Sequence, residues 1–244
     1  FIHNKKDTLS TAIYTALNYL NRKSENIKYK VISDIPPKRG MGSSAAVSIA
    51  AIRGVLDYFN TEVDNLTLEK LVNEAEIIAH NTPSGLDAKT CLSDSAIKFI
   101  KNKGFKNLEM NLGAYLLIAD TGIHGHTRDA IMNIKNMGDR ALPMLEKLGK
   151  LTEETEKFIE EKDVINIGKN MISAHGELKK LGVSIEKSDV LVKAAIDEGA
   201  YGAKMSGGGL GGCIIALMES REKAEMTGKK LMEKGAVNIW IEAL

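Results

Sequence analysis

Pro36-Pro-Lys-Arg-Gly-Met-Gly-Ser-Ser-Ala-Ala46 is the stretch that decides the fold, because its glycines and serines stand between two regular patterns. Before it, Ile27, Tyr29 and Val31 alternate with lysines, which predicts a strand with one solvated face. After it, apolar residues recur at helical spacing over residues 45–59, which predicts an amphipathic helix. The sequence therefore predicts a strand, a glycine loop and a helix in succession.

This glycine loop has three interpretations. Gly40-x-Gly42-x-x-Ala45 fits the loose dinucleotide-binding pattern, but residues 61–66 are polar and do not form the acid-ending strand that such a fold needs next. The second interpretation is a phosphate cradle, in which Ser43 and Ser44 offer hydroxyl and N–H groups to a triphosphate and its Mg²⁺. The third is a tight turn in which a serine caps the helix. No Gly-Lys-Ser/Thr ends the loop, so it is not a Walker A motif.

Two acidic residues follow the loop. A helix predicted over residues 67–80 places Glu76 and His80 on its polar face, and Asp87 follows a turn that is rich in proline, serine and glycine. Phosphoryl transfer from ATP needs Mg²⁺ on oxygen ligands and a carboxylate that orients or deprotonates the acceptor hydroxyl. Glu76 and Asp87 are candidates for these tasks. A solvated surface charge for Glu76 and a helix cap for Asp87 are the alternatives.

A second glycine loop covers residues 206–212, between two predicted strands. Five of its seven residues are glycine, and a simple hairpin does not need so much backbone freedom. We therefore expect its backbone to lie close to a ligand or to the first glycine loop.

The rest of the chain predicts an α+β protein built of two-layer α/β domains, because strands and helices alternate to its end. A change of composition places the domains at residues 1–112 and 113–244. Further helices are expected at 8–20, 189–198 and 221–234 and between 127 and 181, and strands at 96–100, 114–119, 202–205, 213–218 and 237–242.

Composition narrows the class of protein. With 33 Lys and Arg against 32 Asp and Glu, the net charge of +1 attracts neither nucleic acid nor an anionic membrane. Cys91 and Cys213 lie far apart without metal-ligand spacing, so both are expected in the core of a reduced, cytoplasmic protein. No run of 18 apolar residues occurs, and no membrane-spanning helix is expected.

Taken in order, these motifs resemble those of the GHMP kinase superfamily, above all its bacterial-type mevalonate kinases. Residues 36–46 are similar to the ATP loop of that superfamily, Pro-x-x-x-Gly-Leu-Gly-Ser-Ser-Ala. Residues 76–87 are similar to the segment that runs from its Mg²⁺-binding Glu to its catalytic Asp, and residues 204–213 to its last motif. Asp120-Thr-Gly with Thr127-Arg128 is a weaker match to the segment that helps to hold mevalonate.

The resemblance implies a fold and a site. The fold would be a ribosomal-S5-domain-2-like N-terminal domain, with a left-handed βαβ unit, followed by a ferredoxin-like C-terminal domain. Ser44 and Glu76 would bind Mg²⁺, and Asp87 would be the catalytic residue that takes the proton of the mevalonate 5-hydroxyl. ATP would be held by Pro37, Lys38, Arg39, Gly40, Met41, Gly42, Ser43, Ser44, Ala45 and Ala46, and the substrate by Asp87, Thr127, Gly207, Gly208 and Gly209.

The implied activity is the ATP- and Mg²⁺-dependent phosphorylation of mevalonate, a small molecule of isoprenoid biosynthesis, by a cytoplasmic enzyme for which a homodimer is one expected assembly. Phosphomevalonate kinase, homoserine kinase, diphosphomevalonate decarboxylase and a non-catalytic nucleotide-binding module are the alternatives. Gly208 and Leu210 replace the more usual Ala and Gly of the last motif. The first motif, a strand Lys before Gly-Glu-His, is absent, and we expect further residues before Phe1 to carry it.

Overall fold

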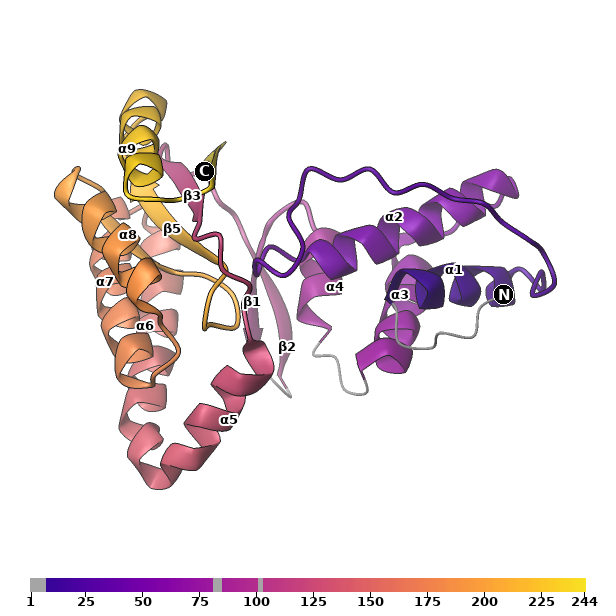
Figure 1. Ribbon diagram of the computed structural model, residues 1–244, viewed down its shortest axis with the longest axis horizontal. Coiled ribbons are helices and arrows are strands. Elements are labelled where there is room, and N and C mark those ends of the chain that lie inside the picture. The colour runs from indigo at the N-terminus through magenta and orange to yellow at the C-terminus, as the bar shows by residue number, and fades with distance from the viewer. Residues whose placement is uncertain (1–7, 81–84, 101–102) are drawn as a thin grey trace. The chain divides into compact units, whose positions relative to one another are not determined.

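The computed structural model describes residues 8–80, 85–100 and 103–244. The chain divides into two compact units (Figure 1). The N-terminal unit comprises residues 1–37 and 42–107, and the C-terminal unit comprises residues 38–41 and 108–244. The domain boundary expected between residues 112 and 113 stays a prediction. Among the described residues, no helix is both long and apolar enough to cross a bilayer.

The helices and strands alternate as the α+β prediction requires, which confirms the fold class. In the first part of the chain they are α1 (Thr8–Tyr19), α2 (Ser43–Tyr58), α3 (Asn65–His80), α4 (Leu86–Cys91), β1 (Ala96–Ile100) and β2 (Gly104–Leu108). In the second part they are β3 (Tyr115–Asp120), α5 (Thr127–Met137), η1 (Gly138–Ala141), α6 (Leu142–Glu160), α7 (Val164–Lys180), α8 (Glu186–Asp197), β4 (Gly202–Met205), β5 (Cys213–Met218), α9 (Arg221–Glu233) and β6 (Asn238–Ala243).

The core of the N-terminal unit lies between α1, α2 and α3. Leu17, Ile52 and Val72, one from each helix, are at most 1% exposed. They belong to one apolar cluster that the predicted helical stripes supply. The amphipathic patterns thus correctly identified the buried faces of these helices. The left-handed βαβ unit implied for this domain stays a prediction.

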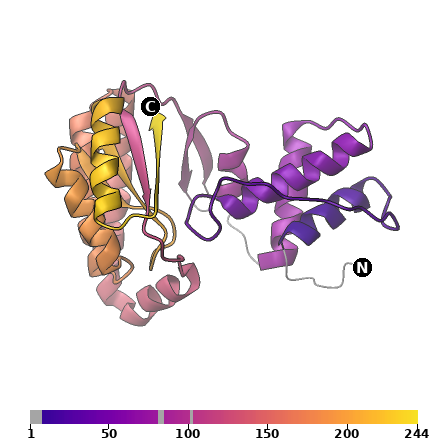
Figure 2. The ribbon, with the colours of Figure 1, turned by 45° about the horizontal axis from the view of Figure 1, so that its top comes forward.

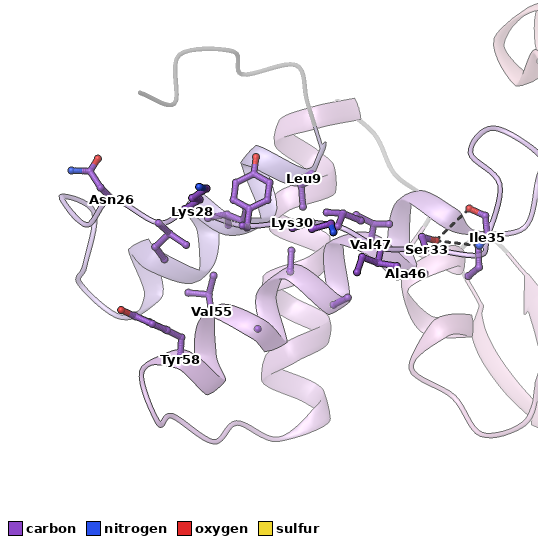
Figure 3. Close-up of a pocket in the computed structure, with 18 residues that line it drawn as sticks. Leu9, Asn26, Lys28, Lys30, Ser33, Ile35, Ala46, Val47, Val55 and Tyr58 are labelled. Carbon is purple, nitrogen blue, oxygen red and sulfur yellow. Dashed lines mark hydrogen bonds between the residues drawn. The ribbon is translucent and has the colours of Figure 1, made fainter.

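The strand predicted over residues 27–31 is wrong. The segment is extended but pairs with no strand among the described residues, and a strand needs a partner for its backbone groups. Ile27 packs against the apolar cluster of the helices, whereas Tyr29 and Val31 stay exposed at 49% and 46%. Beneath the segment, a groove of about 800 Å³ runs along α1 and α2. Figure 3 shows Lys28 and Lys30 on the segment and Val47 on α2 at this groove.

The C-terminal unit contains a four-stranded sheet in the order β4-β5-β3-β6, and each adjacent pair is antiparallel. Strands and intervening helices follow the β-α-β-β-α-β succession of ferredoxin-like folds, with β3, β4, β5 and β6 as its four strands. Asp120, at the end of β3, pairs with Cys213 at the start of β5. This register brings the loop that follows β3 and the loop that precedes β5 to the same end of the sheet.

Helices α8 and α9 supply the core of the C-terminal unit. Leu191 of α8 and Leu231 of α9 are fully buried in one cluster with Leu117 of β3 and Ile214 of β5. Figure 2 shows α9, in yellow, lying along the sheet. The sheet is thereby closed on this face by the two helices that alternate with its strands.

We expect Leu117→Ala to destabilise the C-terminal unit by about 2–5 kcal/mol, because it empties space in a fully buried site of the central strand. Trp240, the one tryptophan of the chain, lies in β6 beside β3 and reports the unfolding of this unit in denaturant. Leu142→Ala is the matched control, since Leu142 is 51% exposed and its loss should cost no more than about 0.5 kcal/mol. Equal midpoints for the two variants would contradict the assigned core.

Candidate active site

The predicted ATP loop is divided between the two units. Lys38 to Met41 belong to the C-terminal unit, whereas Gly42 and the helix α2 that follows belong to the N-terminal unit. Gly40 and Gly42 have φ angles of 72° and 66°, which side-chain-bearing residues rarely adopt. The loop is therefore built around two positions that favour glycine.

The two serines of the loop stand in the first turn of α2. The N-cap is Gly42, which has no side chain, so the interpretation of this segment as a serine-capped turn is wrong. The first N–H groups of a helix lack partners within it and carry its positive dipole end. Ser44 is exposed and Ala45 is buried against the core. The start of α2 thus presents N–H and hydroxyl groups of the kind that bind phosphate.

The two candidate carboxylates lie in different surroundings within the N-terminal unit. Glu76 of α3 is only 6% exposed, so its interpretation as a solvated surface charge is wrong. Asp87 is exposed in the first turn of α4. The N-cap of α4 is Gly85, at φ 75°, and not Asp87, so the capping alternative is wrong too. The side chain of His80 and residues 81–84, which the resemblance included, lie outside the described part of the chain.

Cys91 shows that the loop and the two carboxylates converge. Its Sγ lies 3.9 Å from the carbonyl oxygen of Gly42. Burial raises the pKa of the Cys91 thiol, and the negative charges of Asp87 and Glu76 raise it further. Cys91 is nevertheless exposed, so its predicted place in the core is wrong, because it ends the short helix α4 at the surface. The prediction for the buried Cys213 is confirmed.

The two glycine loops meet within the C-terminal unit. A Cβ atom on Gly207 would lie 2.8 Å from the Cα of Gly40, and one on Gly40 would lie 3.0 Å from the Cα of Gly207. Gly207 also has a φ of 81°. The close approach of the second loop to the first, expected from its glycine content, is confirmed.

Backbone hydrogen bonds join the second glycine loop to the loop after β3. Thr121 donates to the carbonyl of Gly212 through its backbone N–H, at 3.1 Å, and through Oγ1, at 2.6 Å. Gly212 N donates to Ile123 O at 2.8 Å, and His126 N donates to Gly209 O at 3.0 Å. The motif around Asp120, which was the weakest match in the sequence, thus frames the second glycine loop directly.

Thr127 and Gly208, both predicted to contact substrate, are in contact with each other. A Cβ atom on Gly208 would lie 2.0 Å from Oγ1 of Thr127. Glycine in place of the more usual alanine therefore makes room for the threonine. Leu210, the second departure from the motif, donates its N–H to Val183 O at 2.8 Å and packs in the apolar cluster around Met205.

A buried polar network lies behind the second glycine loop, and sequence reasoning missed it. The buried Nδ1 of His175 accepts a hydrogen bond from Met205 N at 3.3 Å, and its Nε2 lies 3.1 Å from the carboxylate of Asp189. Burial lowers the pKa of His175 although Asp189 opposes this change. Burial also lowers the pKa of Lys204, whose Nζ donates to Met205 O at 2.7 Å. The network thereby fixes the strand that leads into the loop.

Arg39 differs from the other predicted ATP-loop residues because its side chain is bound within the C-terminal unit. Its Nε donates to a carboxylate oxygen of Asp120 at 2.9 Å, and its Nη1 lies 2.8 Å from Nδ1 of His124. Its Nη2 donates to Gly122 O at 3.1 Å. Residues 39 and 120 are 81 positions apart, and no local pattern in the sequence connects them.

The predicted metal ligands fit Mg²⁺ in their chemistry. Among the described residues, no three His, Cys, Asp or Glu side chains form a group that suits a metal ion. Mg²⁺ is usually held by one or two carboxylates, waters and substrate phosphates, and Ser44 and Glu76 offer oxygens of the required kind. The groove of the N-terminal unit is a poorer candidate, since no acidic residue lines it and Ala46 is its one predicted site residue.

Two family models match this chain. The model of the GHMP kinases N terminal domain covers residues 11–94, and that of the GHMP kinases C terminal domain covers residues 155–236. The chain therefore belongs to the GHMP kinase family.

Within that family, the chain is similar to several mevalonate kinases. The chain is 31% identical to the mevalonate kinase of Pyrococcus furiosus over 229 residues, which are 90% of this chain and 68% of the relative. It is 33% identical to that of Aeropyrum pernix over 200 residues, which are 79% of this chain and 61% of the relative. The chain thus spans about two thirds of the length of these curated relatives.

Solved structures show the same similarity. The mevalonate kinase of methicillin-resistant Staphylococcus aureus MRSA252 matches with a TM-score of 0.80 and 28% identity, over 98% of this chain and 78% of the other. The L. major mevalonate kinase in complex with R-mevalonate matches with a TM-score of 0.81 over 99% and 78%, and at 22% identity it supports the fold alone.

We expect Gly208→Ala to lower stability by about 1–3 kcal/mol, because its methyl group must displace the side chain of Thr127. Thermal unfolding measures this change. Gly149→Ala in α6 is the control, since a Cβ there meets nothing within 4 Å and alanine favours a helix by up to about 1 kcal/mol. If Gly208→Ala unfolds at or above the wild-type temperature, as the control should, the contact between Gly208 and Thr127 is not as described.

We also expect Cys91 to react slowly with iodoacetamide at pH 8, because its raised pKa leaves little thiolate. The rate should rise with pH and should be faster in Glu76→Gln and Asp87→Asn, which remove the charges that raise this pKa. Glu74→Gln, an exposed change on the same helix, is the control. Cys213 should not interfere, since burial raises its pKa to about 12. Mass spectrometry gives the rates, and equal rates in all variants would refute the convergence on Cys91.

Proposed function

We propose that this protein transfers the γ-phosphate of ATP to the 5-hydroxyl of mevalonate in a Mg²⁺-dependent reaction. The observation that supports this most is the convergence, within the N-terminal unit, of the glycine-capped start of α2, the buried Glu76 and the exposed Asp87 around Cys91. The names of the similar relatives support mevalonate as the acceptor.

The nucleotide side of this proposal uses the loop of residues 37–46. The N–H groups at the start of α2 and the hydroxyl of Ser43 hold the phosphates at the positive end of the helix dipole. Ser44 and Glu76 hold Mg²⁺, which when bound neutralises the charge of the phosphate oxygens. Burial suits Glu76 to this task, because a carboxylate out of water interacts more strongly with a cation.

The acceptor side uses Asp87, which takes the proton of the hydroxyl as it attacks the phosphate. Its exposure leaves the carboxylate accessible to a substrate. Thr127 and the backbone of residues 207–209 bind the rest of the substrate. The cytoplasmic location and the homodimer stay predictions.

The acceptor can be identified by measuring turnover of the full-length protein with ATP, Mg²⁺ and each candidate alcohol. We expect ADP release with mevalonate and much less with phosphomevalonate or homoserine, and no CO₂ from diphosphomevalonate. Structures of a homoserine kinase and a phosphomevalonate kinase share this fold at 22% and 17% identity, which does not distinguish acceptors. Preference for one of these acceptors over mevalonate would replace the proposed substrate. ATP binding without turnover of any of them would favour a non-catalytic nucleotide-binding module.

Asp87→Asn should lower kcat by about 10²–10⁴-fold, because the variant loses the base, while ATP affinity measured by calorimetry should change little. Asp57→Asn, an exposed change near the end of α2, is the control and should keep wild-type turnover. Wild-type turnover by Asp87→Asn would rule out the assigned role of Asp87.

A further inference from the structure

Four residues of the C-terminal unit interrupt the N-terminal unit. The chain enters the C-terminal unit at Lys38 and leaves it at Met41, and Gly42 then begins the approach to α2. The first part of the predicted ATP loop therefore belongs to the C-terminal unit. Gly125 N donates to Lys38 O at 3.0 Å, but a single backbone hydrogen bond does not determine the direction of a segment.

Arg39 makes the side-chain contacts that hold this segment. Its guanidinium group reaches the carboxylate of Asp120, Nδ1 of His124 and the carbonyl of Gly122, all on the loop after β3 or at its start. The side chain of Arg39 is 13% exposed and that of Asp120 is 4% exposed, so water competes weakly for this ion pair. Because arginine only donates hydrogen bonds, Nδ1 of His124 is the acceptor, and its proton is on Nε2.

Asp120 is well suited to anchor Arg39, because its own position is fixed. It ends the central strand β3 between Cys213 and Asn238, and its Oδ1 accepts a hydrogen bond from Gly122 N at 2.8 Å. The planar guanidinium directs its N–H groups along fixed directions to three acceptors, which a lysine ammonium cannot reproduce. Arg39 is therefore committed to the loop after β3 and is not a free phosphate ligand.

We infer that Arg39 is a positioning residue, which acts through Asp120 and His124 to hold residues 38–41 of the ATP loop in register with the loop that leads to Thr127. Three segments of the C-terminal unit are then linked: residues 38–41 of the ATP loop through Arg39, the loop after β3, and the second glycine loop, which is hydrogen-bonded to the loop after β3. This inference rests on the proposed function, since its kinetic consequence requires that ATP binds at residues 37–46.

The test uses Arg39→Met, Asp120→Asn and the double variant in the full-length protein. Each single change should raise KM and Kd for ATP by about tenfold or more, because small displacements of positioning groups have large effects on rate and binding. The double variant should be no worse than the more damaged single variant, because the two residues act as one unit. Arg39→Lys, which keeps the charge but loses the planar geometry, should not restore wild-type KM. Arg53→Met, an exposed change on α2, is the control.

An NMR measurement that does not depend on turnover tests this inference separately from the proposed function. In the wild type, the imidazole ¹⁵N resonance of His124 Nδ1 should be that of a hydrogen-bonded acceptor, and it should shift in Arg39→Met. If the wild type phosphorylates none of the alcohols, the proposed function fails, while the ATP Kd and the His124 resonance still test Arg39. If Arg39→Met does not fold, Arg39→Lys and Asp120→Asn provide the same comparisons.

Three results would overturn the inference. The first is an unchanged Kd for ATP in folded Arg39→Met. The second is damage in the double variant equal to the product of the two single effects, which would mean independent roles. The third is a lower unfolding temperature with unchanged KM and Kd, which would mean that Arg39 only stabilises the unit.

Discussion

The contact between the backbones of Gly40 and Gly207 constrains the glycine loops of the C-terminal unit. A Cβ atom on either residue would lie 3.0 Å or less from the other residue's Cα, so this arrangement excludes side chains at both positions. The chain leaves the C-terminal unit after Met41, the residue that follows Gly40, and α2 begins at Ser43. The conformation of the ATP loop at Gly40 therefore depends on Gly207 of the second glycine loop.

The antiparallel register of the C-terminal sheet also constrains the loops around the second glycine loop. Because Asp120 pairs with Cys213, the loop after β3 and the loop before β5 leave the sheet side by side. A slip of one residue would turn every side chain of β3 to the other face and remove Leu117 from its cluster, so the buried core specifies this register strongly. The geometry of the loops thus depends on core residues that take no part in the chemistry.

Sequence reasoning succeeded where the signal is local. Helical and alternating patterns identified the helices and the strands of the C-terminal sheet, and the glycine content of residues 206–212 indicated a close backbone approach. It failed where the outcome depends on tertiary partners. The strand over residues 27–31 finds no pairing among the described residues, Glu76 is buried on the polar face of its helix, and Arg39 binds a residue 81 positions away. No local pattern contains these relationships.

Gly208 and Leu210, which replace the more usual Ala and Gly of the last motif, are explained by the residues that they contact. At Gly208 the side chain of Thr127 occupies the space that the methyl group of an alanine would take. The space is therefore filled although the residue at position 208 has no side chain. At Leu210 a φ of 55° costs about 1–3 kcal/mol for a residue with a side chain. Burial of a leucine side chain contributes about 1.5–3 kcal/mol when complete, and Leu210 is partly buried beside Met205. The two terms are of similar size, so this loop is held in its strained conformation by an apolar anchor, where a glycine would leave it freer to move.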